Sequence, residues 1–175
     1  EYISLSPYQY RKREIYSLLC FHSHEAGLEE KELYWRVMEL KQHFKAAHQV
    51  FPTLADHDLM KYVPTLEDLD YTQTALEEAG RLMDRIVRVS GRKPEMMRIE
   101  RDLLILRGAM LWWSGKYEDA EGALREGLEK AIKIGETEPV VEACVQICYL
   151  AIQNDDERRL SAFANRVYLL SIKDH

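Results

Sequence analysis

The residues best suited to metal or redox chemistry are three cysteines and a few histidines. Cys20, His22 and His24 follow one another two residues apart. On a helix, positions two apart point in different directions, so these side chains cannot converge on one ion. Cys144 and Cys148 lie one turn apart, where two small buried residues are favoured over a soft-metal or redox pair. We therefore predict no metal site and no cofactor.

Charged residues do not form a catalytic pattern in this sequence. The runs Glu29–Glu32 and Glu77–Glu78 are interpreted as solvated helix faces with partners one turn away. The sequence contains no nucleophile elbow, phosphate-binding loop or dinucleotide fingerprint. We predict that this chain is not an enzyme and has no catalytic residues.

The overall charge argues against a nucleic-acid partner. The net charge is -6, whereas nucleic-acid-binding surfaces need a clustered positive field. The basic run Arg11–Arg13 is interpreted as a solvated helix face. Three cysteines without disulfide spacing indicate a reducing compartment, and no apolar run has membrane-spanning length. We expect a cytoplasmic protein that uses neither nucleic acid nor membrane as a partner through this domain.

The elements that carry these residues are predicted to be helices. Only 8 glycines and 5 prolines occur in 175 residues, which favours long helices with short turns over a β-rich fold. Apolar residues also recur every three or four positions. The chain is therefore predicted to be all-α, with seven or eight helices. Their expected ranges are Pro7 to Ala26, Leu28 to Phe51, Ala55 to Lys61, Asp70 to Val89, Glu95 to Ser114, Tyr117 to Ile134, Pro139 to Ile152 and Glu157 to Ile172.

One segment, LLILRGAMLWWSGKYEDAEGALREGLEKAI, resembles a tetratricopeptide repeat. In that resemblance Gly108 allows the second helix to approach, and Gly115 forms the turn. Tyr117 packs under the turn, Ala120 lies at the tightest crossing, and Leu124 fills the space toward the next hairpin. The family's early aromatic residue is Leu104 here. The resemblance implies stacked antiparallel hairpins that curve into a superhelix.

A weaker second copy follows the first. Leu150 is aligned with Leu111, which gives a repeat of 39 residues, longer than the minimal repeat of about 34. In residues 1–92, apolar residues recur at helical spacing, but no tetratricopeptide motif is present. We expect a single helical repeat domain over 1–175, with a degenerate part at 1–92 and tetratricopeptide-like hairpins at 93–175.

In such a stack, the first helix of each hairpin lines a groove that binds extended or helical peptides. Trp112 and Trp113 point about 100° apart on a helix, so both cannot face one core. We expect one to pack between helices and the other to lie at the groove or an interface. The alternative is that both are half-buried against a neighbouring helix. The full set of groove candidates is Asp102, Ile105, Ala109, Trp112, Trp113, Val141, Cys144 and Cys148.

The two ends suggest a piece of a larger protein. There is no initiator methionine, and the last residues resemble the lead-in to a diguanylate cyclase (GGDEF-type) domain. The leading hypothesis is a protein- or peptide-binding regulatory domain of a bacterial signalling protein, attached to a cyclase or a transcription regulator. Two alternatives remain open: a structural or dimerisation scaffold, for which four N-terminal tyrosines could supply a homodimer contact, and a small-molecule sensor.

Overall fold

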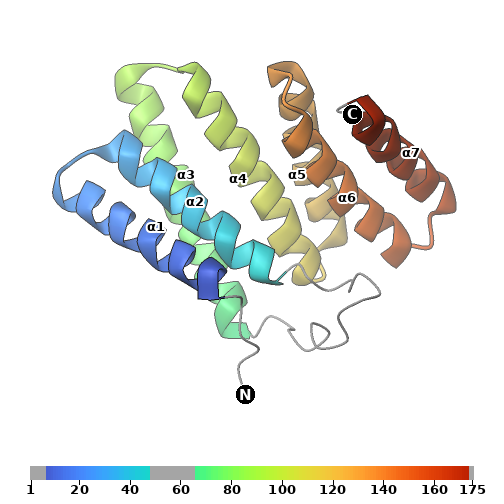
Figure 1. Ribbon diagram of the computed structural model, residues 1–175, viewed down its shortest axis with the longest axis horizontal. Helices are drawn as coiled ribbons and strands as arrows, with labels where there is room; N and C mark the ends of the chain where they lie inside the picture. The colour runs from blue at the N-terminus through green and yellow to red at the C-terminus, as the bar shows by residue number, and fades with distance from the viewer. Residues whose placement is uncertain (1–6, 48–65, 174–175) are drawn as a thin grey trace. The chain divides into compact units, whose positions relative to one another are not determined.

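The structure is a computed structural model that describes residues 7–47 and 66–173 (Figure 1). All secondary structure in these residues is helical, which confirms the predicted all-α class. The predicted short helix Ala55 to Lys61 and the end of the helix predicted to reach Phe51 lie outside the described residues. The seven described helices are α1 (Pro7–Glu25), α2 (Glu29–Ala47), α3 (Leu66–Ser90), α4 (Pro94–Trp113), α5 (Tyr117–Ile134), α6 (Thr137–Gln153) and α7 (Glu157–Lys173).

Helix boundaries follow the proline and glycine signals of the sequence. Pro94 stands at the first position of α4, where its missing N–H costs nothing. Gly135 ends α5 with φ of 83°, and its N–H closes the last turn on carbonyl oxygens of that helix. The bounds of α5 are those predicted, and α4, α6 and α7 differ from prediction by two residues or fewer.

The chain divides into two compact units, Glu1–Gly91 and Arg92–His175. The division falls beside the boundary expected between residues 92 and 93. Unit 1 contains α1, α2 and α3, with α2 packed against both of the others. Unit 2 contains α4 to α7, and here α6 contacts each of the other three helices.

The core of unit 1 comes from apolar stripes at helical spacing. Leu33, Val37 and Leu40 of α2 are almost fully buried, as are Ala79 and Ile86 of α3. These residues step by three, four or seven positions, so each stripe lies on one face of its helix. The hydrophobic effect of this burial holds α2 between α1 and α3.

Unit 2 is held by close helix crossings at small residues. A Cβ atom added to Gly108 of α4 would lie 2.5 Å from Cγ of Leu124 on α5 and 3.2 Å from the carbonyl oxygen of Ala120. Ala120 and Leu124 are fully buried, and Tyr117 is half-buried at the start of α5. A second close approach occurs at Gly127, where an added Cβ would lie 2.9 Å from Ile105.

Three helical hairpins share one turn geometry. Gly27, Gly115 and Asp155 each have positive φ, at 64°, 74° and 54°. Each turn is closed by three backbone N–H groups that donate to carbonyls four, three and five residues earlier. The donor and acceptor pairs are Ala26 to His22, Gly27 to His24, Leu28 to Ser23, Ser114 to Met110, Gly115 to Trp112, Lys116 to Leu111, Asn154 to Leu150, Asp155 to Ile152 and Asp156 to Ala151.

These turns correct one sequence-based alignment and show a shared turn geometry in the N-terminal part, where a degenerate hairpin was one possibility. Asp155 takes the place of Gly115, so the repeat in unit 2 is 40 residues and Leu150 is equivalent to Met110, not Leu111. The hairpin of α1 and α2, in which the sequence showed no motif, has the same turn at Gly27. Its residues are equivalent to those of the α4–α5 hairpin 88 positions later.

Candidate functional site

An aromatic cluster lies where α4 ends. The rings of Trp112 and Trp113 meet edge to face, with centroids 4.8 Å apart and planes at 76°. The ring of Tyr149, from α6, lies 5.9 Å from that of Trp112 at 33°. All three side chains are half-buried. Trp112 therefore packs toward a neighbouring helix, while both tryptophans keep part of their surface accessible.

The hairpin connectivity explains why these residues meet. Because α4 and α6 are the first helices of consecutive antiparallel hairpins, they run in the same direction and contact each other directly (Figure 1). The last turn of α4 then lies beside the last turns of α6, which brings Tyr149 against Trp112. The side chain equivalent to Trp112 in the second hairpin is Ile152, which is 50% exposed. Apolar surface therefore continues along this end of the two helices.

The cluster is uncharged, and its interior includes the indole N–H of Trp112. Nε1 of Trp112 is buried and has no hydrogen-bond partner among the described residues. A buried N–H left without an acceptor costs about 1–3 kcal/mol. Burial raises the pKa of Tyr149 and of Cys148 beside it, so both side chains stay neutral near pH 7. The accessible part of the cluster is therefore uncharged aromatic surface.

Half of the predicted groove residues are buried in the core instead of lining an open groove. Ile105 is 2% exposed because its side chain lies against Gly127 of α5. Ala109 and Cys144 are also enclosed by packed helices, at 3% and 0% exposure. Asp102 is 9% exposed and pairs with Arg101. Of the other candidates, Val141 and Cys148 are half-buried, like the tryptophan pair.

A buried arginine joins the starts of α4 and α6. Arg101 is 4% exposed, and its Nε donates to Oδ1 of Asp102 at 2.8 Å. Its guanidinium also donates to the carboxylate of Glu136, which stands at the N-cap position of α6 and accepts a second bond from Arg98 at 2.7 Å. These contacts fix α6 relative to α4 at the end opposite the aromatic cluster. The Arg101 hydrogen bond holds the pKa of Glu136 below its ordinary value.

This lowered pKa predicts an acid-sensitive contribution to stability. The contribution of Glu136 is fully present above its ordinary pKa near 4.5 and is lost as pH falls through the lower pKa of the folded state. We expect Glu136→Gln to lower stability at pH 7 and to make the decline below pH 4.5 shallower. Urea denaturation from pH 3 to 7 measures both. Glu138→Gln, at an exposed position of the same turn, is the control, and identical pH profiles for the two variants would contradict the assignment.

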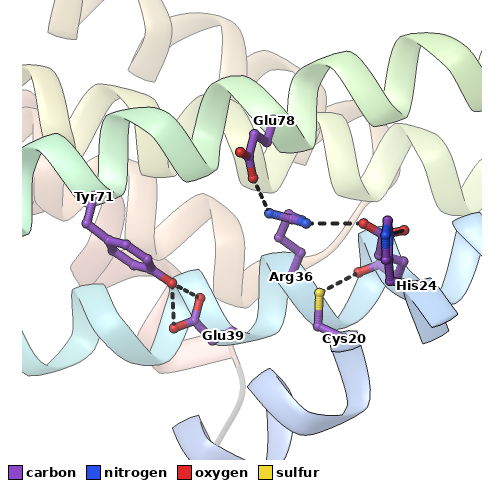
Figure 2. A network of polar contacts seen from close by, with 7 residues as sticks. Cys20, His24, Arg36, Glu39, Tyr71 and Glu78 are labelled. Atoms are coloured by element: carbon purple, nitrogen blue, oxygen red, sulfur yellow. Dashed lines mark hydrogen bonds and ion pairs between the residues drawn. The ribbon is translucent and has the colours of Figure 1, made fainter. Parts of the chain in front are cut away.

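Unit 1 contains a separate network of polar contacts on α2 (Figure 2). Glu32 and Glu39 are buried, at 5% and 6% exposure, and Arg36 lies between them on the same face. Arg36 donates to Glu32 at 3.1 Å and to Glu78 of α3 at 2.5 Å. Glu39 accepts from the Tyr71 hydroxyl at 3.0 Å. The network therefore ties α2 to α3.

The same carboxylates tie α2 to α1. Nδ1 of His24 lies 3.1 Å from Glu32, and Nε of Arg13 donates to Glu39 at 3.0 Å. The Cys20 thiol lies 3.7 Å from the backbone carbonyl of Glu32. Two sequence-based interpretations are thereby wrong. Glu32 is not part of a solvated face, and Arg13 is half-buried in an ion pair with another helix.

The network holds α1, α2 and α3 together. Each buried carboxylate is already bound by a guanidinium, and burial raises the pKa of the Cys20 thiol, which disfavours the nucleophilic thiolate. Glu32, Arg36 and Glu39 are equivalent to Ala120, Leu124 and Gly127 of the α4–α5 hairpin. The first hairpin thus has a polar seam where the second has small and apolar residues. Their spacing of four and three residues is the sequence signal that could have revealed it.

Among the described residues, no three His, Cys, Asp or Glu side chains are grouped to hold a metal ion. No helix in the described ranges is both long and apolar enough to cross a membrane. Comparison with known proteins found no matching protein-family model, no matching curated protein and no matching solved structure.

Proposed function

We propose that this chain is a non-catalytic protein-interaction module that binds a peptide segment at the aromatic cluster of α4 and α6. The observation that carries the proposal is the cluster of the half-buried side chains of Trp112, Trp113 and Tyr149. Repeated hairpins with a common turn geometry support a repeat module of the tetratricopeptide kind. Such modules present the first helix of each hairpin to a ligand.

The proposed contact follows from the chemistry of the cluster. An apolar peptide side chain packs on the exposed parts of the three rings. Tryptophan and tyrosine are frequent anchors of interfaces because they combine large apolar area with one polar group. Exposed Ile152 extends this surface by about one turn of α6.

A peptide-library experiment tests the proposal. A random peptide library is panned on the purified chain, and enriched peptides are measured by fluorescence polarisation. Trp112→Phe keeps an aromatic side chain but replaces the indole with a smaller ring, and we expect binding to weaken about three- to tenfold through the lost contact area. Trp35→Phe is the matched control, because Trp35 is a half-buried tryptophan that stacks on Tyr16 in unit 1. The proposal would be contradicted if panning enriched no peptide. It would also be contradicted if the two variants lost equal binding affinity.

In this proposal the module regulates an attached output domain of a bacterial signalling protein, either a diguanylate cyclase or a transcription regulator. The coding sequence that follows His175 tests this part separately. A continuing reading frame that encodes neither kind of domain would remove the signalling assignment and leave the peptide-binding proposal intact.

A further inference from the structure

The outer face of α1 carries an apolar stripe. Ile15, Leu18 and Phe21 are 51%, 58% and 56% exposed, and they follow one another at three-residue spacing on one side of the helix. The inner side, which packs against α2, is formed by Tyr16, Leu19 and Ser23. Each of these three large apolar side chains therefore exposes more than half of its surface to water, and together they cover about 9 Å of helix. Single exposed apolar residues are ordinary, whereas a contiguous stripe indicates a contact surface.

The order of residues along this stripe is self-complementary around Leu18. Ile15 stands three residues before Leu18 and Phe21 three residues after it. Glu14 stands four residues before and His22 four residues after, and both are exposed on the same face. If two such helices lie antiparallel with both Leu18 residues at the two-fold axis, Ile15 lies level with Phe21 of the second copy. Glu14 then lies level with His22 of the second copy, which places acceptor opposite donor.

From this pattern we infer that α1 is the contact surface of a homodimer, formed by antiparallel pairing of α1 with α1 of a second copy. Isologous two-fold pairing requires a surface that complements itself, and the apolar and polar positions of α1 both meet this requirement. The inference is independent of the proposed peptide-binding function, which concerns unit 2.

A second exposed stripe, on α7, provides the comparison. Tyr168, Leu169 and Ile172 are 63%, 60% and 53% exposed. They are confined to the last turns of α7, whereas the preceding turns of its outer face carry Arg158 and Asn165. With Leu169 at the two-fold axis, antiparallel pairing of two α7 helices would set the exposed Arg166 level with Ile172 of the other copy, an apolar residue that offers no acceptor. The charge pattern thus favours α1 over α7 as the self-pairing helix.

The small stripe predicts a weak dimer. Three large apolar residues per copy bury much less than the roughly 800 Å² per partner of a standard interface. We therefore expect a concentration-dependent monomer–dimer equilibrium. Sedimentation velocity from about 10 µM to 1 mM should show the average mass rising toward two copies. Sedimentation of the unchanged protein as a monomer over the whole range would overturn the inference.

Surface variants locate the contact. Leu18→Glu places two carboxylates opposite each other at the axis, and we expect at least a tenfold weaker dimer. Leu169→Glu makes the same change on α7 and should leave the dimer unchanged, while circular dichroism verifies the fold of both. Equal weakening by the two variants would overturn the assignment to α1.

The antiparallel register has its own test. Glu14→Lys removes the acceptor that faces His22 of the other copy and should weaken the dimer, and adding His22→Glu to the same chain should restore a donor–acceptor pair in the reverse sense. Leu18→Cys should form a disulfide-linked dimer under mild oxidation, whereas Leu169→Cys should not. The register would be overturned if the dimer of the double variant were no tighter than that of Glu14→Lys alone. It would also be overturned if Leu169→Cys formed the disulfide-linked dimer and Leu18→Cys did not.

Discussion

Replacing Arg36 with methionine is expected to destabilise the chain by about 2–4 kcal/mol. Glu32 is 5% exposed, and without Arg36 its carboxylate loses its guanidinium partner, while its contact with the exposed His24 ring remains. Removing one member of a buried ion pair typically costs 3–5 kcal/mol because the other charge stays buried. The expected loss is smaller than this typical value because the Arg36 side chain is itself 24% exposed. Urea denaturation followed by circular dichroism measures the loss.

The second hairpin indicates how the loss can be reversed. Ala120 and Leu124 stand at the positions equivalent to Glu32 and Arg36, and both are fully buried without charge. We therefore expect Glu32→Ala combined with Arg36→Met to be within about 1 kcal/mol of the unchanged protein, since apolar replacements of buried ion pairs are often neutral. Additive losses in the double variant would show that the polar seam itself stabilises the hairpin.

A surface ion pair supplies the matched control. Arg85 of α3 lies 2.8 Å from Glu29 of α2, with side chains 59% and 41% exposed. Arg85→Met should cost less than about 1 kcal/mol, because exposed ion pairs contribute little. If Arg85→Met and Arg36→Met were equally destabilising, burial of Glu32 would not be the cause.

The helices could be predicted from the sequence because local signals coincide with tertiary packing. Prolines and glycines stand at their ends, and apolar residues recur at helical spacing, as in Leu33, Val37 and Leu40. The sequence predicts the turn of the α6–α7 hairpin at Asn154–Asp155, where the structure has it, but the alignment of Leu150 with Leu111 is one residue out of register. The alignment relied on matching leucines, whereas the structure conserves a backbone shape, and Asp155 adopts the positive φ that Gly115 adopts. Asp tolerates that conformation, so residue type alone conceals the equivalence.

The first hairpin could not be recognised for a different reason. Its seam positions carry Glu32, Arg36 and Glu39, which look like surface residues in the sequence. Only the approach of Arg13 from α1 and of Tyr71 and Glu78 from α3 makes their burial tolerable. Such partners lie 26 to 42 residues away in the chain and leave no local pattern.

The aromatic site was predictable in part. Trp112 and Trp113 could be singled out because adjacent helical positions cannot share one core. Tyr149 could not, because its contact depends on how closely α6 approaches α4. The same dependence explains Ile105, whose side chain turns toward α5 where Gly127 leaves room. Helical periodicity predicts on which side of its own helix a residue lies. It does not predict which neighbouring helix that side contacts.

Gly108→Ala is expected to destabilise the chain by about 1–3 kcal/mol, although alanine is the better helix former. The added Cβ would lie 2.5 Å from Cγ of Leu124, which is fully buried and cannot move aside, and 3.2 Å from a backbone oxygen. Overpacking of this kind forces shifts that outweigh the gain of up to about 1 kcal/mol in helix propensity. Thermal and urea denaturation measure the change.

Gly122→Ala is expected to change the stability of the chain in the opposite direction. Gly122 also lies inside a helix, α5, but it is exposed and a Cβ there meets no atom within 4 Å. The substitution therefore changes only the helix propensity, which is higher for alanine, and we expect stabilisation by about 0.5–1 kcal/mol. Opposite signs for the two glycines would tie the effect at Gly108 to the α4–α5 crossing. A stabilising Gly108→Ala would mean that these two helices are farther apart than the structure places them, and with them the hairpin that presents Trp112.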